Sequence, residues 1–567
     1  MKKFILISFL GLMVMAFSTS AYAQIETKIF GLIDAQWFYN VNATGANPAA
    51  GTYDANAFKF GPPIAIDLDP GPGTRIILLP NKQGGALDRK VNYYESRARL
   101  GFTATADKNL TGTILFEMDA NPWGGTPDSA RNNMGYWAAD RAAVEIKNVY
   151  IDFGLPYIGI PLPMNFRVGL QPWAVRPALL LTTDGMGINW STKIDPVAIQ
   201  LFYAKPFEGK TAVSQDDSDV LGGHVSAKLG TLSAGLYALY YNMNQFPLPG
   251  AALPYGTPAN FDAEMWWYGL YMDGKLGPVN INLDGIMDSG KVMPRPSVFG
   301  PGPGTIGNPF ISDVKYRGWA AHAKIDLPWD KFNFGVMGYY ASGSDANDTD
   351  PLGLPGNKTN NSAVIEALTA GINPRFPTGI PNYSSKVSSY VIPPGSESGA
   401  AYGESVVFYS FYGNRGDSGI ANSLNYSSMS RGPMGGTWMA KAYASAKIAP
   451  WYKIIFQGMY IGDTTKNGDT FGNAAKINWI PTGPGTFTGF TQRKDSSSIG
   501  WEFDIINEIQ IYKNLKLTVA GGYLFAGKAM DQYTNITNIF PVPFGAFPNN
   551  SDIKNPWALM WNLQYTF

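Results

Sequence analysis

The chain ends in WALMWNLQYTF, residues 557–567, and this stretch decides the fold. Side chains of an extended chain alternate between two faces. The residues on one face are all large and apolar: Trp557, Leu559, Trp561, Leu563, Tyr565 and Phe567. The residues between them are mostly small or polar: Ala558, Met560, Asn562, Gln564 and Thr566. An uncovered aromatic face favours a β-strand whose outer side meets the hydrocarbon of a membrane. The alternative is an edge strand of a secreted soluble domain.

The start of the chain predicts export. Lys2 and Lys3 precede an apolar run over residues 4–17, and residues 21–23 (AYA) offer a small-x-small cleavage site. These features predict a Sec signal peptide over residues 1–23, with the mature protein beginning at Gln24. No other stretch approaches the roughly 18 uninterrupted apolar residues of a membrane helix. A mature protein in a membrane would therefore cross it as a barrel.

Composition agrees with a large β-protein and excludes several classes of function. The 567 residues include 64 glycines, 14% aromatic residues and only 15% charged residues, and the mean hydropathy is −0.10. Because there is no cysteine, disulfides, thiolate metal sites and covalent haem attachment are excluded. Removal of Lys2 and Lys3 with the signal peptide leaves 41 basic groups (43 minus 2) against 43 acidic groups, a balance that predicts no nucleic-acid partner.

Alternating segments of about ten residues recur from Gln24 onward, the length that a tilted strand needs to cross a bilayer. Short turns and long loops alternate between them, as in membrane barrels. The pattern predicts an all-β fold, a transmembrane antiparallel β-barrel of 18 strands over residues 24–567, with short periplasmic turns and long extracellular loops. A 16-strand barrel is the alternative. The predicted strands span residues 27–39, 94–104, 111–119, 143–153, 164–171, 186–192, 197–205, 223–229, 232–243, 264–275, 279–289, 313–326, 331–342, 437–448, 452–462, 498–511, 515–527 and 557–567.

One predicted extracellular loop, residues 343–435, is disproportionately long. Structureless loops of this length are uncommon. We therefore expect it to fold over the barrel mouth or to pack beside it. A surface excursion without a gating role is the alternative.

Ionisable residues fall on the predicted inward faces. A charge that faces lipid near the bilayer midplane costs about 2–4 kcal/mol, so these side chains must line a wet interior. Their mixed signs predict weak steering of ions. The alternative is that most of them pair across neighbouring strands and stiffen the wall. The candidate pore-lining residues are Glu95, Arg97, Arg99, Glu117, Asp119, Glu145, Lys147, Arg167, Asp284, Lys324, Lys441, Glu502 and Asp504.

These segments resemble Gram-negative outer-membrane porins. The terminal strand is similar to the porin strand that ends in Phe and is read by the barrel-assembly machinery, here through Phe567. YESRARLGFTA (94–104) and NFRVGLQPW (165–173) resemble the second and fifth strands of general porins. The hairpin of residues 500–527, GWEFDIINEIQIYKNLKLTVAGGYLFAG, is similar to the closing hairpin of alginate-export-type barrels with 18 strands.

The general-porin resemblance implies a constriction loop that folds into the lumen, with acidic groups facing an arginine ladder on the wall. In this chain the ladder would be Arg97, Arg99 and Arg167, and residues 173–185 would form the loop, with Asp184 as its acidic group. The loop departs from the family pattern, because it is short and carries Arg176 and the apolar residues 179–181. An apolar loop that packs on the wall is the alternative.

The sequence gives little support for an enzyme or a cofactor. The only histidines, His224 and His322, fall on strands without a nucleophile motif. A weak Ca²⁺ candidate is the acidic stretch with Asp345, Asp348 and Asp350, but Thr349 and Pro351 break the helix-loop-helix pattern and favour a solvated loop. We therefore predict no catalytic residues, no metal and no cofactor.

The resulting hypothesis is a porin in the bacterial outer membrane that passes small hydrophilic solutes and ions passively. Outer-membrane lipids and lipopolysaccharide would surround it, and a homotrimer is expected by analogy with porins alone. Two alternatives remain. One is a substrate-selective channel, for example for an oligosaccharide or polysaccharide, and the other is a plugged structural or adhesion barrel.

Overall fold

The computed structural model describes residues 25–41, 61–67, 76–81, 90–123, 143–155, 162–209, 216–246, 261–294, 314–343, 386–397, 404–409, 429, 434–464, 481–483, 486–487, 496–530 and 555–567. The predicted signal peptide, residues 1–23, lies outside the described residues. So do the Ca²⁺ candidates Asp345, Asp348 and Asp350.

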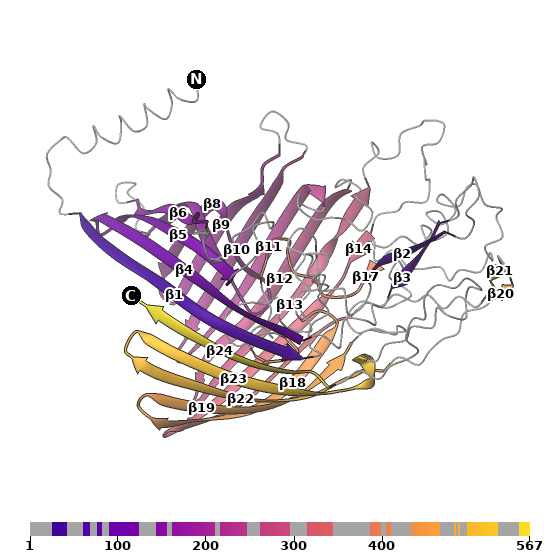
Figure 1. Ribbon diagram of the computed structural model, residues 1–567. Coiled ribbons are helices and arrows are strands. Elements are labelled where there is room, and N and C mark those ends of the chain that lie inside the picture. Colours follow the sequence, from indigo (N-terminus) through magenta and orange to yellow (C-terminus); the bar gives the residue numbers. More distant parts are fainter. Residues whose placement is uncertain are drawn as a thin grey trace.

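The wall is a closed antiparallel barrel of 18 strands (Figure 1), so the predicted fold class and strand number are confirmed and the 16-strand alternative is wrong. The wall strands are β1 (Glu26–Val41), β4 (Lys90–Asp107), β5 (Leu110–Pro122), β6 (Glu145–Gly154), β7 (Asn165–Val175), β8 (Leu181–Ile194), β9 (Val197–Phe207), β10 (Ser218–Leu229), β11 (Leu232–Phe246), β12 (Phe261–Leu276), β13 (Val279–Pro294), β15 (Trp319–Trp329), β16 (Phe332–Ala341), β18 (Thr437–Ala449), β19 (Tyr452–Asp463), β22 (Ser498–Tyr512), β23 (Leu515–Ala526) and β24 (Trp557–Thr566).

The terminal strand closes the barrel. β24 pairs with β23 on one side and with β1 on the other, with Trp561 opposite Trp37, and Figure 1 shows yellow β24 beside indigo β1. The backbone of Phe567 exchanges hydrogen bonds of 2.9 and 3.1 Å with Gly31. Closure leaves no wall strand with an unpaired edge, which is what a lipid environment demands of a sheet.

The two faces of the wall differ as the alternation predicts. On β1, Ile33 is 49% exposed on the outside, whereas Asp34 and Gln36 are fully buried on the inside. Aliphatic side chains such as Leu270 and Val336 lie outward in the middle of their strands. Aromatic side chains are exposed near both strand ends, at Trp266, Tyr340 and Trp501 toward the long loops and at Trp329, Trp451 and Tyr512 toward the short turns. Such paired aromatic girdles mark the two interfaces of a membrane barrel.

Short turns join the wall strands at one end. Gly230 and Gly277 lie in two of these turns with φ of 66° and 62°, a conformation that favours glycine. Two hairpins form sheets of their own: β2 (Gly61–Asp67) with β3 (Ile76–Asn81), and β20 (Pro481–Gly483) with β21 (Thr486–Phe487). Two short strands extend the main sheet beyond the wall strands: β14 (Val314–Tyr316) pairs with β13, and β17 (Lys386–Val387) pairs in parallel with β14. Within the described residues, no helix is long and apolar enough to cross a membrane.

Candidate functional site: the barrel lumen

Glu117 is the centre of an ionic network on the inner wall. Its carboxylate lies 2.6 Å from Nε of Arg99, 2.8 Å from Nζ of Lys147 and 3.7 Å from Nε of Arg97. Lys147 also reaches Asp184 at 2.9 Å. These charges from β4, β5, β6 and β8 pair with one another across neighbouring strands, which neutralises much of the wall locally.

The predicted constriction loop is shorter than expected. β7 runs to Val175 and β8 begins at Leu181, so Asp184 lies on a strand and only residues 176–180 form the turn. The strands extend because Trp173 and Val175 alternate into a buried face, and Trp173 Nε1 donates to the carbonyl of Gly185 at 3.0 Å.

Asp184 consequently contacts a different partner from the one that the general-porin resemblance implies. It binds Lys147, and Asn148 donates to it at 2.7 Å, instead of facing the predicted arginine ladder. Arg167 lies near the short-turn end, where it pairs with Asp152 at 2.6 Å. The three arginines therefore do not form a ladder opposite Asp184.

The β7–β8 turn, residues 176–180, reaches across the lumen to strands that are not its neighbours. Arg176 donates from Nε to Asp284 on β13 at 2.6 Å and from Nη1 to Asp273 on β12 at 2.6 Å. Its guanidinium also lies 3.8 Å from the centre of the Tyr271 ring. Arg176 has a φ of 45°, which residues with a Cβ adopt rarely, so the turn is held by these contacts.

Residues 386–397, here called the first inward segment, pack inside the barrel against the turn and the wall. The indole of Trp267 donates to the carbonyl of Val391 at 2.8 Å, and Asp288 accepts the Val391 amide at 3.1 Å. The Tyr390 hydroxyl donates to the carbonyl of Leu179 in the β7–β8 turn. Trp267, Tyr390 and Leu179 are fully buried. Part of the lumen is therefore a packed apolar core.

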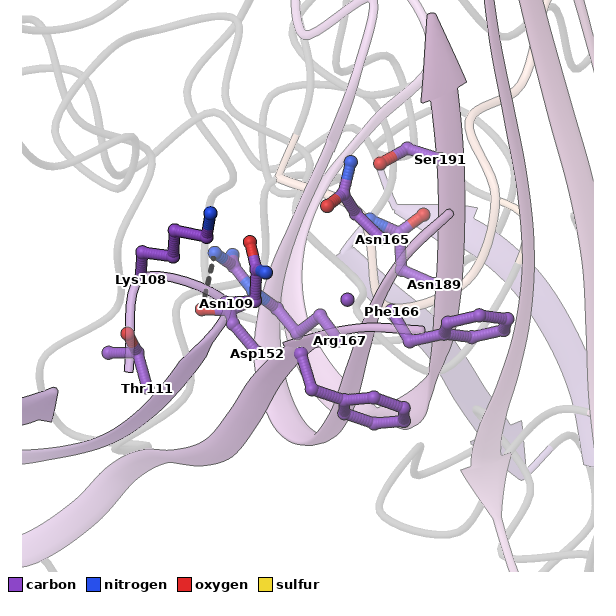
Figure 2. Close-up of a pocket in the computed structure, with 11 residues that line it drawn as sticks. Lys108, Asn109, Thr111, Asp152, Asn165, Phe166, Arg167, Asn189 and Ser191 are labelled. Carbon is purple, nitrogen blue, oxygen red and sulfur yellow. Dashed lines mark hydrogen bonds and ion pairs between the residues drawn. The ribbon is translucent and has the colours of Figure 1, made fainter. Parts of the chain in front are cut away.

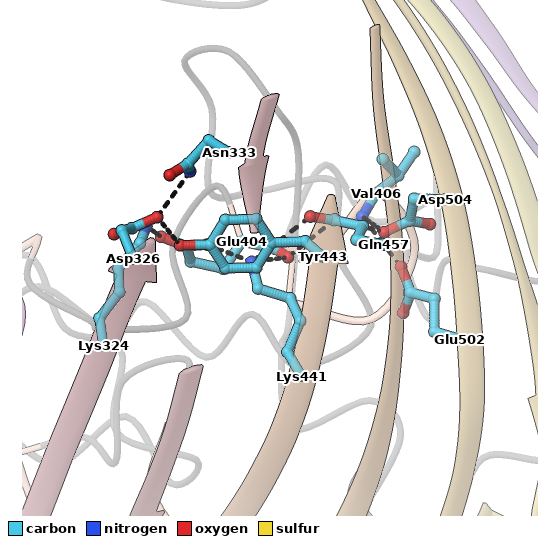
Figure 3. Close-up of polar contacts among 10 residues, drawn as sticks. All are labelled: Lys324, Asp326, Asn333, Glu404, Val406, Lys441, Tyr443, Gln457, Glu502 and Asp504. Carbon is cyan, nitrogen blue, oxygen red and sulfur yellow. Dashed lines mark hydrogen bonds and ion pairs between the residues drawn. The ribbon is translucent and has the colours of Figure 1, made fainter. Parts of the chain in front are cut away.

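Residues 404–409, here called the second inward segment, are bound to the wall by a polar network (Figure 3). Glu404 forms ion pairs with Lys441 on β18 and, at 3.0 Å, with Lys324 on β15. Gln457 on β19 donates to the Glu404 carbonyl at 3.0 Å. Burial acts to raise the pKa of Glu404, but the two lysines outweigh it and hold that pKa below its usual value.

The same segment binds the wall through its backbone. Glu502 on β22 accepts the amides of Val406, Val407 and Phe408 at 2.9, 2.7 and 3.0 Å. Asp504 accepts the Val406 amide at 3.2 Å. Thus the Glu404 carboxylate of the segment binds two lysines of the wall, while two carboxylates of the wall bind backbone amides of the segment. Charge-assisted hydrogen bonds of this kind are among the stronger ones in proteins.

Two glycines make room for the inward segments. A Cβ on Gly522 of β23 would lie 2.2 Å from Asp504 Oδ1 and 2.9 Å from Val406 Cβ. A Cβ on Gly318 would lie 2.4 Å from both Asp288 Oδ2 and Tyr390 Cα. The segments approach the wall closely only because these positions carry no side chain.

The remaining predicted residues occupy varied surroundings. Glu95 is fully buried and accepts a hydrogen bond of 2.6 Å from Gln36. Glu145 lies opposite Glu117 in the register and is exposed. Asp119 belongs to β5, but its side chain lies outside the described residues.

Sequence reasoning missed Glu404, Tyr390 and Trp267. The first two lie in the long loop, residues 343–435, whose route no strand pattern specifies. Trp267 lies between the outward-facing Trp266 and Tyr268. The alternation of the strand predicts that Trp267 faces inward, but it does not show that a loop covers it.

The two histidines lie on the inner face. His224 Nε2 lies 2.7 Å from the Tyr271 hydroxyl, and His322 on β15 is 7% exposed and pairs with Asp284 in the register. Among the described residues, no group of three or more His, Cys, Asp or Glu side chains is arranged to hold a metal ion.

A polar cavity of about 280 Å³ lies at the short-turn end of the barrel (Figure 2). It is lined by Lys108, Asn109, Thr111, Asp152, Phe153, Gly154, Asn165, Phe166, Arg167, Asn189 and Ser191. Arg167 binds Asp152 in a bidentate geometry, with hydrogen bonds of 2.6 and 3.1 Å.

No protein-family model and no curated protein match the chain. Among solved structures, the fold is similar to OccK8 (OprE) of Pseudomonas aeruginosa, with a TM-score of 0.43 and 9% identity over 96% of this chain and 98% of that one. It is also similar to the outer membrane protein OpdK of the same organism, with a TM-score of 0.41 and 9% identity over 96% and 99%. OccK9 (OpdG) gives a TM-score of 0.42 and 10% identity over 96% and 99%. The likeness concerns the barrel as a whole and identifies no solute.

Proposed function

We propose that this chain is an outer-membrane channel that passes small hydrophilic solutes passively along a narrowed, selective lumen. The observation that carries the proposal is the inversion of polarity across the wall. Apolar side chains such as Ile33 are exposed on the outside, while Glu117, Glu502 and Lys441 are buried on the inside. In a soluble protein the exposed apolar band would lie in water, whereas in a bilayer hydrocarbon covers it.

The inward segments favour the selective alternative over an open diffusion pore. Residues 176–180, 386–397 and 404–409 bind strands on several sides of the lumen through buried contacts. They reduce the cross-section that a barrel of 18 strands would otherwise leave open. Passage then depends on the charges and hydrogen-bonding groups that remain accessible.

The cellular setting is part of the same proposal. The predicted signal peptide, the aromatic terminal strand and the girdles support a place in the outer membrane, with lipids and lipopolysaccharide around the wall. Phe567 would be the signal to the barrel-assembly machinery. The short turns would face the periplasm and the long loops the outside. A homotrimer remains an analogy with porins.

Bilayer conductance tests the proposal. Purified protein is added to a planar bilayer, and single-channel current is recorded in KCl with and without candidate solutes. A small, stepwise conductance that specific solutes reduce in a saturable way is the expected result. A large ohmic conductance that no solute affects would favour the open diffusion pore instead.

A plugged structural barrel is the second candidate, and the buried packing of Tyr390 and Leu179 inside the lumen favours it. This reading predicts folded protein that inserts into bilayers without any steps of current. Resistance of the inserted protein to unfolding in cold SDS shows that insertion and folding succeeded. The absence of current steps from such protein would then contradict the channel function.

A further inference from the structure

Two rows of inward-facing positions, most of them polar, cross neighbouring strands at the short-turn end, the first over four strands and the second over three. In the first row the register places Thr111, Asp152, Arg167 and Asn189 side by side on β5, β6, β7 and β8. In the second row Gly154, Asn165 and Ser191 are neighbours. The alternate positions Phe153, Phe166 and Trp190 are paired across the same strands and therefore share the opposite, outward face.

These rows form the floor of the polar cavity of about 280 Å³ (Figure 2). Phe153 and Phe166 belong to the lining, but they occupy strand positions whose side chains face outward. The side chains that line the cavity from inward-facing positions are all polar. The β4–β5 turn brings Lys108 and Asn109 over one edge, because the Gly154 amide donates to the Asn109 carbonyl at 3.0 Å. The cavity is thus built from the β4–β5 turn and the short-turn ends of four neighbouring strands, β5 to β8.

The charge in the cavity is largely compensated. Both the Nε and Nη2 groups of Arg167 bind the Asp152 carboxylate, and the guanidinium also lies 4.3 Å from the centre of the Tyr150 ring. The one further charged lining residue, Lys108, lies in the exposed turn at the rim. A lone solvated ammonium contributes little binding energy to an anion in water.

Neutral hydrogen-bonding groups remain available. In the described part of the chain, the side chains of Thr111, Asn165 and Ser191 make no hydrogen bond to other protein groups. Asn189 accepts a hydrogen bond of 3.1 Å from Gln200 through Oδ1, which leaves its NH₂ group to donate. Amides and hydroxyls combine donors and acceptors at short spacing, and so match adjacent hydroxyl groups of a solute.

We propose that this cavity is a binding site for a small neutral polyhydroxylated solute of about monosaccharide size, located where the solute leaves or enters the lumen. The site rests on the proposed channel function. Asn165, Ser191 and Asn189 bind solute hydroxyls, and the Arg167–Asp152 pair forms a fixed polar wall that offers a donor edge and an acceptor edge.

The test measures binding and conductance separately on the full-length protein in detergent. Equilibrium dialysis with radiolabelled D-glucose and with radiolabelled acetate gives the two affinities, and planar-bilayer recording gives conductance. We expect saturable glucose binding with acetate binding at least about tenfold weaker. Asn165→Ala and Ser191→Ala should each weaken glucose binding about tenfold, the effect of losing one or two hydrogen bonds. Gln564→Ala removes an inward amide on β24 outside the cavity and should leave glucose binding unchanged.

Asp152→Asn provides an independent readout. It leaves Arg167 without its carboxylate partner, so acetate should now bind about tenfold more tightly than to the unaltered protein. Resistance to unfolding in cold SDS shows whether each variant is folded. Asn165→Ala keeps the test informative if Asp152→Asn does not fold.

Several results would overturn the proposal: no saturable glucose binding, acetate bound more tightly than glucose by the unaltered protein, or glucose binding that Asn165→Ala and Ser191→Ala do not change. Conductance separates this failure from that of the channel. Conductance without glucose binding would contradict the proposed binding site and support the channel function. Glucose binding without conductance would contradict the channel function and support the binding site.

Discussion

Glu404 of the second inward segment is ion-paired with Lys441 on β18, whose side chain is almost completely buried. The pair joins a loop to the wall inside the lumen, and Lys324 contacts the same carboxylate at 3.0 Å. One charge that the loop supplies therefore joins the wall carboxylates Glu502 and Asp504 in fixing the position of the segment.

The first prediction is that Glu404→Gln releases the second inward segment. The amide cannot neutralise Lys441, and leaving a buried charge unpaired costs about 3–5 kcal/mol. We expect a larger and noisier single-channel conductance, and faster protease cleavage within residues 404–409. Glu508→Gln is the matched control, because it removes an ion pair with Lys453 (3.0 Å) that joins two neighbouring wall strands, β19 and β22. Equal conductance and cleavage in Glu404→Gln and the unaltered protein would contradict the role assigned to Glu404.

The second prediction is a pH dependence of the same contact. The pKa of Glu404 is lowered in the docked segment and is about 4.3 in a released one. The carboxylate therefore stabilises docking fully above about pH 4.3, and this stabilisation is lost as pH falls through the lower docked pKa. The part of the conductance that depends on Glu404 should therefore rise only when the pH falls below about 4.3. Lys324 and Lys441 face this carboxylate and keep their positive charge on acidification. His322 also faces it and can only gain positive charge, so protonation of Glu404 leaves more positive charge without a partner beneath the segment.

Glu404→Gln separates this titration from that of the wall carboxylates Glu502 and Asp504, which also contact the segment. The variant lacks the Glu404 proton equilibrium, so its conductance should already be high at pH 7 and should change less on acidification. If conductance rises equally on acidification in both proteins, the transition is due to the wall carboxylates and not to Glu404.

The sequence predicts the wall well because each strand carries its own signal. Alternation along β24 and the polar inward positions Asp34 and Gln36 on β1 are local patterns, and lipid outside with water inside imposes them on every strand. Even the short predicted strand of residues 186–192 lies within β8.

The inward segments follow a different rule. Glu502 binds amides of Val407 and Phe408, which lie 95 and 94 residues away in the sequence. Backbone amides are present at every residue except proline, so they leave no mark in a sequence. The same holds for Gly522, which is needed for a close approach that becomes visible only when both partners are in place.

The third prediction concerns this close approach. Gly522→Ala places a Cβ 2.2 Å from Asp504 Oδ1 and 2.9 Å from Val406 Cβ, so the segment or the carboxylate must move. Overpacking of this kind costs about 1–3 kcal/mol. We expect the conductance change of Glu404→Gln in a weaker form. Gly521→Ala is the control on the adjacent outward position, where the Cβ would lie 2.9 Å from the flexible end of Leu559 and at an ordinary contact distance of 3.7 Å from the Ala558 carbonyl oxygen. The same effect in both alanine variants would point to general strain in β23.

The last prediction concerns the charge that the β7–β8 turn carries into the lumen. Arg176→Met removes one positive charge and leaves the carboxylates of Asp273 and Asp284 without this cationic partner. The lumen becomes more negative there, so cations should pass more readily than anions. A unit charge at about 4 Å in water contributes about 1 kcal/mol, which corresponds to about a fivefold rise in the ratio of potassium to chloride permeability.

The reversal potential in a KCl gradient measures this ratio. Arg176→Lys is the matched variant, since it keeps the charge but loses the geometry that binds two carboxylates at once. It should retain the ion selectivity of the unaltered protein with a noisier current, because the turn is held less firmly. If Arg176→Met leaves the reversal potential unchanged, ions do not pass beside Asp273 and Asp284, and the route through the lumen must avoid this turn.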